Sequence, residues 1–384
     1  KAFAITLIIG IVSSMFTALF MTRTYFSWWV QNPKNKSLNM ANWIHAKKVN
    51  FLKHAKVAFL VAATIILAGG YLVFANRATI FGMDFTGGFS LNVEVEETGS
   101  GQISKQVDKA LKQSGAQGRD FQIRELNPSN HLRLLFGTSM EQPGKPFYAM
   151  PLETEKSHPR YSFEKNPRIV WVVNALKSEG LVLTPASLSA LDADWTSMSG
   201  QMSDSMRNNA LLGLLISFIC IFIYIAFRFE YKFAAAAILC LLHDVLITLG
   251  LMGLLYTLGV PVQIDLNTVA ALMTIVGYSL NDTIIIFDRI REEMHSSQKN
   301  IPLEITVNSA LNATLSRTTI TSGTTLLVLI ALVTIGGASI FSFALVMTIG
   351  VFFGTLSSWY IASPLMLFFH NKETKKEESL VQLS

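Results

Sequence analysis

Seven long apolar runs constrain this chain more than any other feature of its sequence. Each run has about 20 residues or more, which is long enough to cross about 30 Å of hydrocarbon as a helix. The runs are 2–22, 57–76, 209–227, 233–258, 266–287, 318–336 and 340–369. Only 15% of the residues are charged, against about 25% in a typical soluble domain. The sequence therefore predicts a polytopic α-helical membrane protein with seven spans, and it argues against a soluble enzyme.

The distribution of basic residues predicts how the spans are oriented. Segment 23–56 carries seven Lys and Arg side chains and no acid, and such short basic loops stay in the cytoplasm. With seven spans, the other short basic loops and the tail 371–384 fall on the same side. The net charge of +5 follows from this topology, so we do not expect nucleic-acid binding.

The segment 78–207 then lies outside the cytoplasm. It holds 13 basic and 15 acidic residues, a mixture typical of the surface of a folded soluble domain. Its periodicity predicts, in order, a strand, a helix, two strands, a helix and a strand. The expected bounds are strands at 88–96, 121–126, 132–137 and 187–195, helices at 102–114 and 169–180, and a loop at 143–167. This order indicates an extracytoplasmic α+β domain of ferredoxin-like type.

The interiors of the seven spans contain two charged side chains, Asp244 and Asp282. A charge at the centre of a membrane helix costs about 2.5–3.5 kcal/mol on insertion scales, so such residues usually mark a function. For Asp244 a structural role is equally open, because the neighbouring His243 can satisfy it by hydrogen bonding. Cys220 and Cys240 both lie in apolar runs, which predicts neither a disulfide framework nor a metal site.

Asp282 is part of a polar patch in an otherwise apolar span. Tyr278 precedes it by four residues and so shares its helix face, and Asn281 and Thr283 flank it. A polar seam joining helices is one explanation, although a neutral side chain would serve that purpose. Arg317 begins the sixth span and is either an interfacial anchor or a partner that keeps Asp282 ionised. In the second case protonation of Asp282 would break the attraction and act as a switch.

Several motifs together resemble the SecF family of protein-export proteins, in the resistance–nodulation–division superfamily. They are Gly82-Met-Asp-Phe-Thr-Gly-Gly88, His243-Asp-Val245, Gly277-Tyr-Ser-Leu-Asn-Asp-Thr283, Asp288-Arg-Ile-Arg-Glu292 and Ser316-Arg-Thr318. The resemblance covers about residues 50–370, and the first span resembles the final helix of SecD. The chain is thus similar to the C-terminal part of a fused SecDF, with one SecD-like span and six SecF-like spans, and we expect it to be a piece of a longer polypeptide.

The resemblance implies a division of the chain and a signature for its external domain. The expected parts are a SecD-like helix at 1–22, a basic cytoplasmic linker at 23–56, a first SecF-like span at 57–77, the external domain at 78–207, a five-helix membrane domain at 208–370 and a cytoplasmic tail at 371–384. The signature that opens the external domain comprises Gly82, Asp84, Phe85, Gly87 and Gly88.

The resemblance also implies a function. Such proteins are accessory subunits of the Sec translocase in the bacterial inner membrane, where they couple the proton-motive force to preprotein export. The implied partners are a SecD half in the same or a separate chain, the SecYEG channel with other Sec accessory subunits, unfolded preproteins and the lipid bilayer. No cofactor is implied beyond a coupling ion, expected to be H⁺. In this family the positions of Asp282 and Arg317 belong to the proton pathway, and Asn281, Thr283, Tyr278, His243 and Asp244 would support it.

Three other functions are compatible with parts of the sequence. An intramembrane aspartyl protease would use Asp244 and Asp282 as a dyad sharing a proton, but their unequal depths, estimated from the helix rise, argue against it. A small-molecule or lipid exporter of the same superfamily would need larger external domains than the one expected here. A purely structural scaffold would tolerate neutral residues in place of Asp282 and Arg317.

Overall fold

The computed structural model describes residues 2–31, 49–77, 79–96, 103–118, 120–126, 130–154, 159–198, 200–260, 262–296 and 301–381. The chain divides into two compact units, Lys1–Lys47 and Lys48–Ser384. The first unit is a run of helix made of α1 (Ala2–Phe16), the π-helical segment η1 (Thr17–Met21) and α2 (Thr22–Val30). Helix therefore continues eight residues beyond the expected end at 22. Half of the predicted linker 23–56, residues 32–48, lies outside the described residues.

The second unit contains the remaining membrane helices. They are α3 (Phe51–Ala75), α8 (Gly200–Arg228), α9 (Tyr231–Thr257), α10 (Leu266–Ser296), α11 (Leu303–Ile335) and α12 (Gly337–Ser357), the last continued by the π-helical segment η4 (Ser358–Ala362) and α13 (Ser363–Val381). Over the described residues of both units, seven helices are long and apolar enough to cross a membrane. The predicted seven-span membrane protein is confirmed. Several helices start or end beyond the predicted limits: α8 already begins at Gly200, and α10 runs nine residues past 287.

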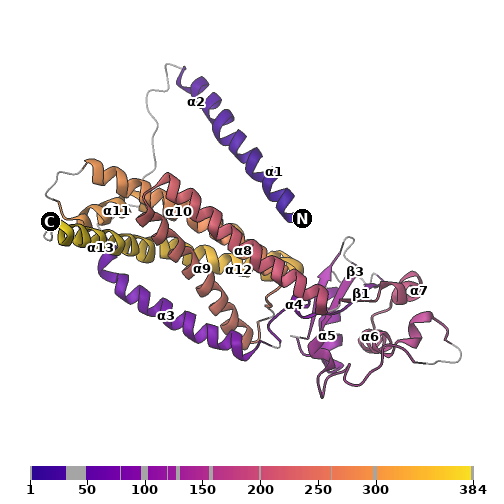
Figure 1. Ribbon diagram of the computed structural model, residues 1–384. Coiled ribbons are helices and arrows are strands. Elements are labelled where there is room, and N and C mark those ends of the chain that lie inside the picture. The colour runs from indigo at the N-terminus through magenta and orange to yellow at the C-terminus, as the bar shows by residue number, and fades with distance from the viewer. Residues whose placement is uncertain are drawn as a thin grey trace. The chain divides into compact units, whose positions relative to one another are not determined.

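Close packing of these helices depends on small residues at the crossings. α3 lies along α9 (Figure 1), and a Cβ added to Gly69 would collide with the backbone of Gly250. α12 contacts α9, α10 and α11. Its Gly350 and Gly354 both face α10, where they meet Ile275 and Ser279. The α12 glycines thus let two helices approach closely enough for polar side chains to meet, as small residues do in membrane proteins.

The external domain is built on one antiparallel sheet of β1 (Gly88–Glu94), β2 (Phe121–Glu125), β3 (His131–Gly137) and β4 (Thr196–Met198). The strand order is β2-β3-β1-β4. Its helices are α4 (Met83–Thr86), α5 (Ile103–Gln113), α6 (Pro167–Ser178) and α7 (Pro185–Asp194), with short 3₁₀ turns η2 (Thr138–Glu141) and η3 (Ser162–Lys165). The order of strands and of the two crossover helices α5 and α6 is that of a ferredoxin-like unit, so the predicted fold class is confirmed.

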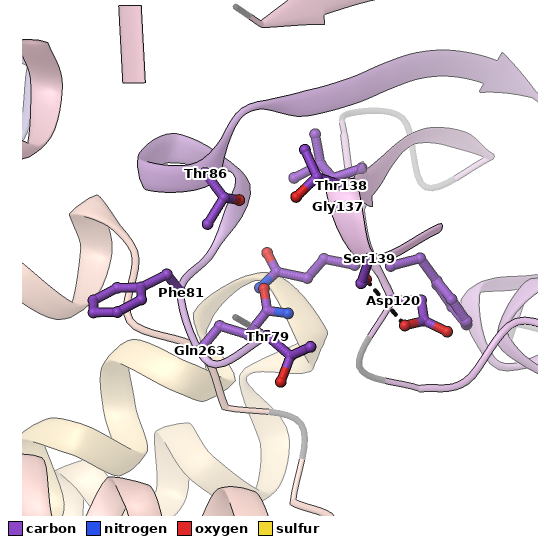
Figure 2. A pocket seen from close by; sticks show the side chains of 11 residues that line it. Thr79, Phe81, Thr86, Asp120, Gly137, Thr138, Ser139 and Gln263 are labelled. Carbon is purple, nitrogen blue, oxygen red and sulfur yellow. Dashed lines mark hydrogen bonds between the residues drawn. The ribbon is translucent and has the colours of Figure 1, made fainter. Parts of the chain in front are cut away.

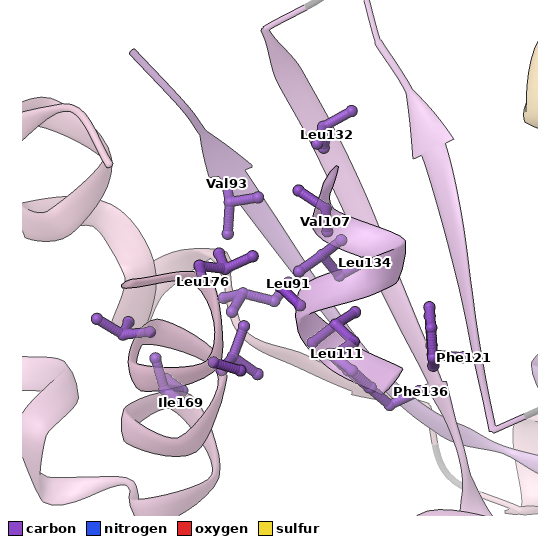
Figure 3. Packing of buried hydrophobic residues seen from close by; sticks show 14 of the residues in the cluster. Leu91, Val93, Val107, Leu111, Phe121, Leu132, Leu134, Phe136, Ile169 and Leu176 are labelled. Carbon is purple, nitrogen blue, oxygen red and sulfur yellow. The ribbon is translucent and has the colours of Figure 1, made fainter. Parts of the chain in front are cut away.

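One apolar core holds this domain together. Leu91 and Leu134 pair across β1 and β3, and they lie against Val107 and Leu111 of α5 and Leu176 of α6 (Figure 3). All five side chains are fully buried. Burial of apolar surface is the main stabilising contribution in such a domain, and it makes the sheet a rigid support for whatever its edges contact.

The predicted strand at 187–195 is wrong, because this segment forms helix α7. The Thr184 side chain accepts a hydrogen bond from the Ser187 backbone N–H, and Pro185 stands at the first helical position. Both are helix-start signals. The last strand comes after the helix, at Thr196–Met198, where it pairs with β1.

Candidate ion pathway and its external junction

Asp282 is buried within the membrane bundle among hydroxyl groups from two neighbouring helices. Its side chain is on α10 and only 1% exposed. Ser322 of α11 donates a hydrogen bond to Asp282 Oδ2 at 3.2 Å, and Thr355 of α12 donates to Ser322 Oγ at 2.8 Å. Asp282 therefore ends a short hydrogen-bonded chain that joins three helices.

Two of the predicted supporting residues join α10 to neighbouring helical segments, Tyr278 to α11 and Thr283 to η4. Tyr278 donates through its hydroxyl to Thr321 O at 3.2 Å and to Thr325 Oγ1 at 3.0 Å. Thr283 Oγ1 lies 3.1 Å from Ser358 Oγ, at the start of η4. π-Helical turns inside α-helices are often found at functional sites. Asn281, in contrast, is exposed and lies about 100° around α10 from Asp282, so it is not among the residues that surround the buried carboxyl group.

Arg317 lies near Asp282 without touching it. The guanidinium is close enough for an electrostatic interaction with the carboxyl group, but Arg317 is exposed. Among the described ion pairs within 4.0 Å, none joins the two side chains. The electrostatic interaction between Arg317 and Asp282 is thus weaker than the direct ion pair that the sequence suggested. The hydrogen bond to the Asp282 carboxyl group comes instead from Ser322, five residues further along α11.

Asp244 is the second acid in the bundle and is also fully buried. Ser279 of α10 donates to Asp244 Oδ2, and His243 Nδ1 lies 3.0 Å from Asp244 Oδ1. Ser279 precedes Asp282 by three residues, so Asp244 of α9 contacts α10 about one helical turn before Asp282. Their hydrogen bonds go to hydroxyls and to His243, and none of those described joins the two carboxyl groups. This arrangement does not support the proton-sharing dyad of an aspartyl protease.

The signature Gly82–Gly88 fastens the start of the external domain to the loop before α10. Gly82 N donates to Ile264 O at 2.9 Å, and Ile264 N donates to Ile80 O at 2.8 Å. Asp84 Oδ2 accepts from the Leu266 backbone N–H at 3.1 Å, the first residue of α10. A Cβ on Gly82 would lie only 2.9 Å from Asp265 Cβ, so this close approach requires glycine.

The rest of the signature anchors and redirects the chain. Phe85 is buried in the apolar cluster of the membrane helices, next to Ile80 and Ile264. Gly87 and Gly88 have φ values of 77° and 149°, a region that favours glycine, and they turn the chain into β1. The five signature residues therefore form a strap between membrane helices and sheet.

A second set of contacts joins β2 to the same loop. Gln122 Nε2 donates to Gln263 Oε1 at 2.6 Å, and Arg124 lies 3.6 Å from Asp265 Oδ2. Figure 2 shows Gln263 and Thr79 facing the end of β3, where Ser139 donates to the buried Asp120 at 3.0 Å. The outer end of α10 is thus held both by the strap and by the sheet.

Asp265 occupies the centre of this junction. Its Oδ1 accepts from the Thr268 backbone N–H at 2.8 Å, so it caps α10. Burial raises the pKa of the Asp265 carboxyl above its ordinary value, and nearby Asp84 raises it further. The Thr268 N–H and Arg124 oppose that shift.

Sequence reasoning missed most of the residues that surround the two acids and form the junction. They are Ser279, Ser322, Thr355, Ser357, Ser358, Gln122, Arg124, Gln263 and Asp265. Only Asp265 carried a usable signal, since an Asp three residues before Thr268 at the start of an apolar run is a helix-cap pattern. Within the described residues, no group of three or more His, Cys, Asp or Glu side chains could hold a metal ion.

Comparison with known proteins places these features in a family. Residues 182–372 match the family described as protein export membrane protein SecD/SecF, C-terminal. The protein translocase subunit SecF of Vibrio alginolyticus is 34% identical over 84% of this chain and 90% of that protein. The protein translocase subunit SecDF of Thermus thermophilus is 30% identical over 99% of this chain, but the match covers 46% of that protein.

The fold agrees with a solved structure. The crystal structure of the Thermus thermophilus SecDF, described as a translocon-associated membrane protein, superposes with a TM-score of 0.69 at 29% identity. The match covers 96% of this chain and 45% of that one. The chain therefore spans nearly the full length of a separate SecF relative and less than half of the fused ones.

Proposed function

Because this chain belongs to the SecD/SecF family of protein-export membrane proteins, we propose that it is an accessory subunit of a bacterial Sec translocase, in the inner membrane, that couples the proton-motive force to preprotein export. The observation that carries the coupling is the position of Asp282. A buried carboxyl group in a membrane helix is costly, and protonation is the one change that removes its charge.

The energy available is adequate for a conformational switch. One elementary charge moving through 100 mV releases about 2.3 kcal/mol. That is about a fiftyfold change in a two-state equilibrium, since 1.4 kcal/mol corresponds to a factor of ten. When Asp282 is neutral, its attraction to Arg317 disappears and its hydrogen bond to Ser322 loses charge assistance. Both changes weaken the contact between α10 and α11.

A route from the acid to the outside supports the proposal. α10 carries Asp282 in its interior and Leu266 at its outer end, where Asp84 binds it. Arg124 and Gln122 of the sheet contact the loop immediately before it. A shift of α10 would therefore act directly on β2 and on the strap.

The proposed partners follow from the family. They are a SecD half in the same or a separate chain, the SecYEG channel, other Sec accessory subunits and unfolded preproteins. Because the match covers less than half of a fused SecDF, we propose that the pathway through Asp282 and Arg317 is completed by a SecD half.

The test is preprotein release from membrane vesicles that contain the full-length protein with its natural partners. Asp282→Asn keeps the side-chain volume and can still accept from Ser322, but it cannot be protonated. We expect its release to become slow and insensitive to an uncoupler, at least tenfold below the wild type in the presence of the gradient. Asp288→Asn removes an exposed acid two turns along the same helix and should behave as wild type. Gradient-dependent release at the wild-type rate by Asp282→Asn would refute the proposal.

A cleft at the junction supports a second candidate, export of a small molecule or lipid. It has a volume of about 420 Å³ and is lined by β2, α5 and the outer ends of membrane helices, with Lys105, Arg124 and Asp265 among its polar groups. Its size is that of a small-molecule site. Efflux of amphipathic dyes from the same vesicles, lost in Asp282→Asn while preprotein release continues, would favour this candidate.

A further inference from the structure

His243 has an unpaired ring nitrogen, and its side chain lines a cavity that the proposed pathway does not use. Its Nδ1 lies against Asp244, whereas its Nε2 is buried without a hydrogen-bond partner among the described residues. A buried nitrogen of this kind is costly unless another molecule pairs with it. His243 is one of the residues that line a cavity of about 300 Å³ between α3, α9, α12 and η4.

The cavity can hold water next to His243. Its walls are mainly apolar, but four polar side chains face it: His54, His243, Ser357 and Tyr360. Water needs two to four polar partners in such a space, and this volume holds on the order of ten molecules. His54 is the fourth residue of α3 and lies between Lys53 and Lys56, so the cavity lies in the half of the bundle at the basic start of this helix, which the positive-inside rule assigns to the cytoplasm.

Contacts lead from this cavity toward Asp282. His243 contacts Asp244, Asp244 accepts from Ser279, and Ser279 is one turn from Asp282 on α10. Ser357 contacts both the cavity and Asp244. Asp244 thus lies between the cavity and the acid of the proposed pathway.

The other titratable groups around the pair are few and identifiable. On the cavity side they are His54 of α3 and Tyr360 of η4. Asp282 stands on α10, Cys240 lies one turn before Asp244 on α9, and α12 carries no titratable side chain. Arg228 of α8 stacks on Phe229, and His370 of α13 contacts Lys232, both at the end of the bundle where these helices meet the basic loops.

We propose that His243 and Asp244 form a second protonation site, through which the proton carried by Asp282 exchanges with water in the cavity on the cytoplasmic side. In the release step, protonated Asp244 gives its proton to His243 Nδ1, and the resulting imidazolium gives its Nε2 proton to water. The carboxylate, the neutral imidazole and a hydronium ion remain. The inference rests on the proposed proton coupling at Asp282, and it adds the exit on the cytoplasmic side.

The first test compares variants in gradient-driven preprotein release by the full-length protein. Asp244→Asn can still accept from Ser279 and bind His243, so a structural role predicts normal release, whereas the proposal predicts a loss of at least tenfold. His243→Gln should slow release and alter its dependence on cytoplasmic pH, which a packing role would leave unchanged. Thr248→Val is the control, because it removes a buried hydroxyl one turn from Asp244, where it bonds only to backbone.

These outcomes separate the inference from the proposed function. If Asp282→Asn abolishes gradient-dependent release and Asp244→Asn does not, proton coupling stands and the second site is wrong. If Asp282→Asn also releases at the wild-type rate, the proposed function itself fails.

The second test probes the cavity and does not depend on altering the acids. Ala62 lines the cavity and is buried, whereas its neighbour Ala63 is exposed and does not line the cavity. Ala62→Trp should fill the cavity and slow gradient-driven release at least tenfold, while Ala63→Trp should have no effect.

A cysteine at Val61, with Cys220 and Cys240 replaced by Ser and Ala, should react with a charged thiol reagent from the cytoplasmic side. Reaction only with a lipophilic reagent would show that lipid fills the cavity and would overturn the proposal.

Discussion

The junction at the outer end of α10 gives the sharpest quantitative prediction. Asp265 has two separable roles there: its Oδ1 caps α10 through the Thr268 N–H, and its Oδ2 lies 3.6 Å from Arg124 of the sheet. Asp265→Ala removes both roles. Asp265→Asn keeps a good capping side chain and removes only the charge opposite Arg124.

The expected costs follow from these contacts. Loss of a helix cap costs about 0.5–2 kcal/mol. The ion pair is long, and the Arg124 side chain is 31% exposed, so it contributes no more than about 1 kcal/mol. Asp265→Ala should therefore destabilise the junction by about 0.5–3 kcal/mol. Asp265→Asn should change its stability by less than about 1 kcal/mol, because the variant loses the ion pair but also removes a buried charge. At 1.4 kcal/mol per factor of ten, local opening should increase about 2- to 150-fold in the first variant and change by less than about fivefold in the second.

Amide hydrogen exchange measures this opening directly. The reporters are the Gly82 and Ile264 N–H groups, which bond across the strap at 2.9 and 2.8 Å. Amides of the β1–β3 ladder around Leu91 and Leu134 serve as the internal control and should not change. Equal protection of Gly82 in Asp265→Ala and in the wild type would refute the view that Asp265 holds the junction closed. Faster exchange throughout β1 and β3 would instead mean that the whole domain is destabilised.

Two more predictions concern pH and packing. Since burial raises the pKa of Asp265 above its ordinary value, the docked junction binds this proton more tightly than the open one. Its extra stability is present at acidic pH and is lost as the pH rises through the raised pKa. Exchange at Gly82 should therefore slow on acidification, after correction for intrinsic rates, and Asp265→Asn should lose this dependence. Gly354→Ala places a Cβ 3.1 Å from Ser279 Cβ and 3.6 Å from Asp244 Oδ2. The crowding costs about 1–3 kcal/mol against a gain of about 1 kcal/mol in helix propensity, so gradient-driven release should fall more than thermal stability in detergent.

The sequence was sufficient for features that depend on composition and periodicity. Seven apolar runs predicted seven helices, because a bilayer imposes both length and hydrophobicity on a span. In the external domain, alternation at 88–96 and helical spacing at 102–114 predicted β1 and α5 nearly to the residue. The error at 187–195 arose where Leu188 and Leu191 were assigned to a strand, although Thr184-Pro185 marks a helix start.

The surroundings of the acids could not be predicted in the same way. Ser279, Ser322 and Thr355 lie on three different helices, and no local pattern states which faces of three helices meet. Hydroxyl side chains are also common in membrane helices, where they can bond to their own backbone. Asn281 shows that proximity in the sequence can also mislead. It is adjacent to Asp282 in the sequence, but its side chain lies on the exposed face of α10.

For the coupling proposed at Asp282, a weak interaction with Arg317 is better suited than a strong one. A buried ion pair in direct contact would keep the carboxylate charged, and removing one partner would cost about 3–5 kcal/mol, more than the approximately 2.3 kcal/mol that one proton supplies at 100 mV. A carboxyl group held by Ser322 at 3.2 Å, with Arg317 further away, can be neutralised and recharged within that energy. In the proposed coupling, the 31-residue α10 would then carry the resulting shift to Asp265 and Asp84 at its outer end, where the cap and the ion pair contribute about 0.5–3 kcal/mol, an energy of similar size. A Ser322→Ala variant should therefore change the pH at which export is half-maximal, whereas an engineered direct Asp282–Arg ion pair should arrest it.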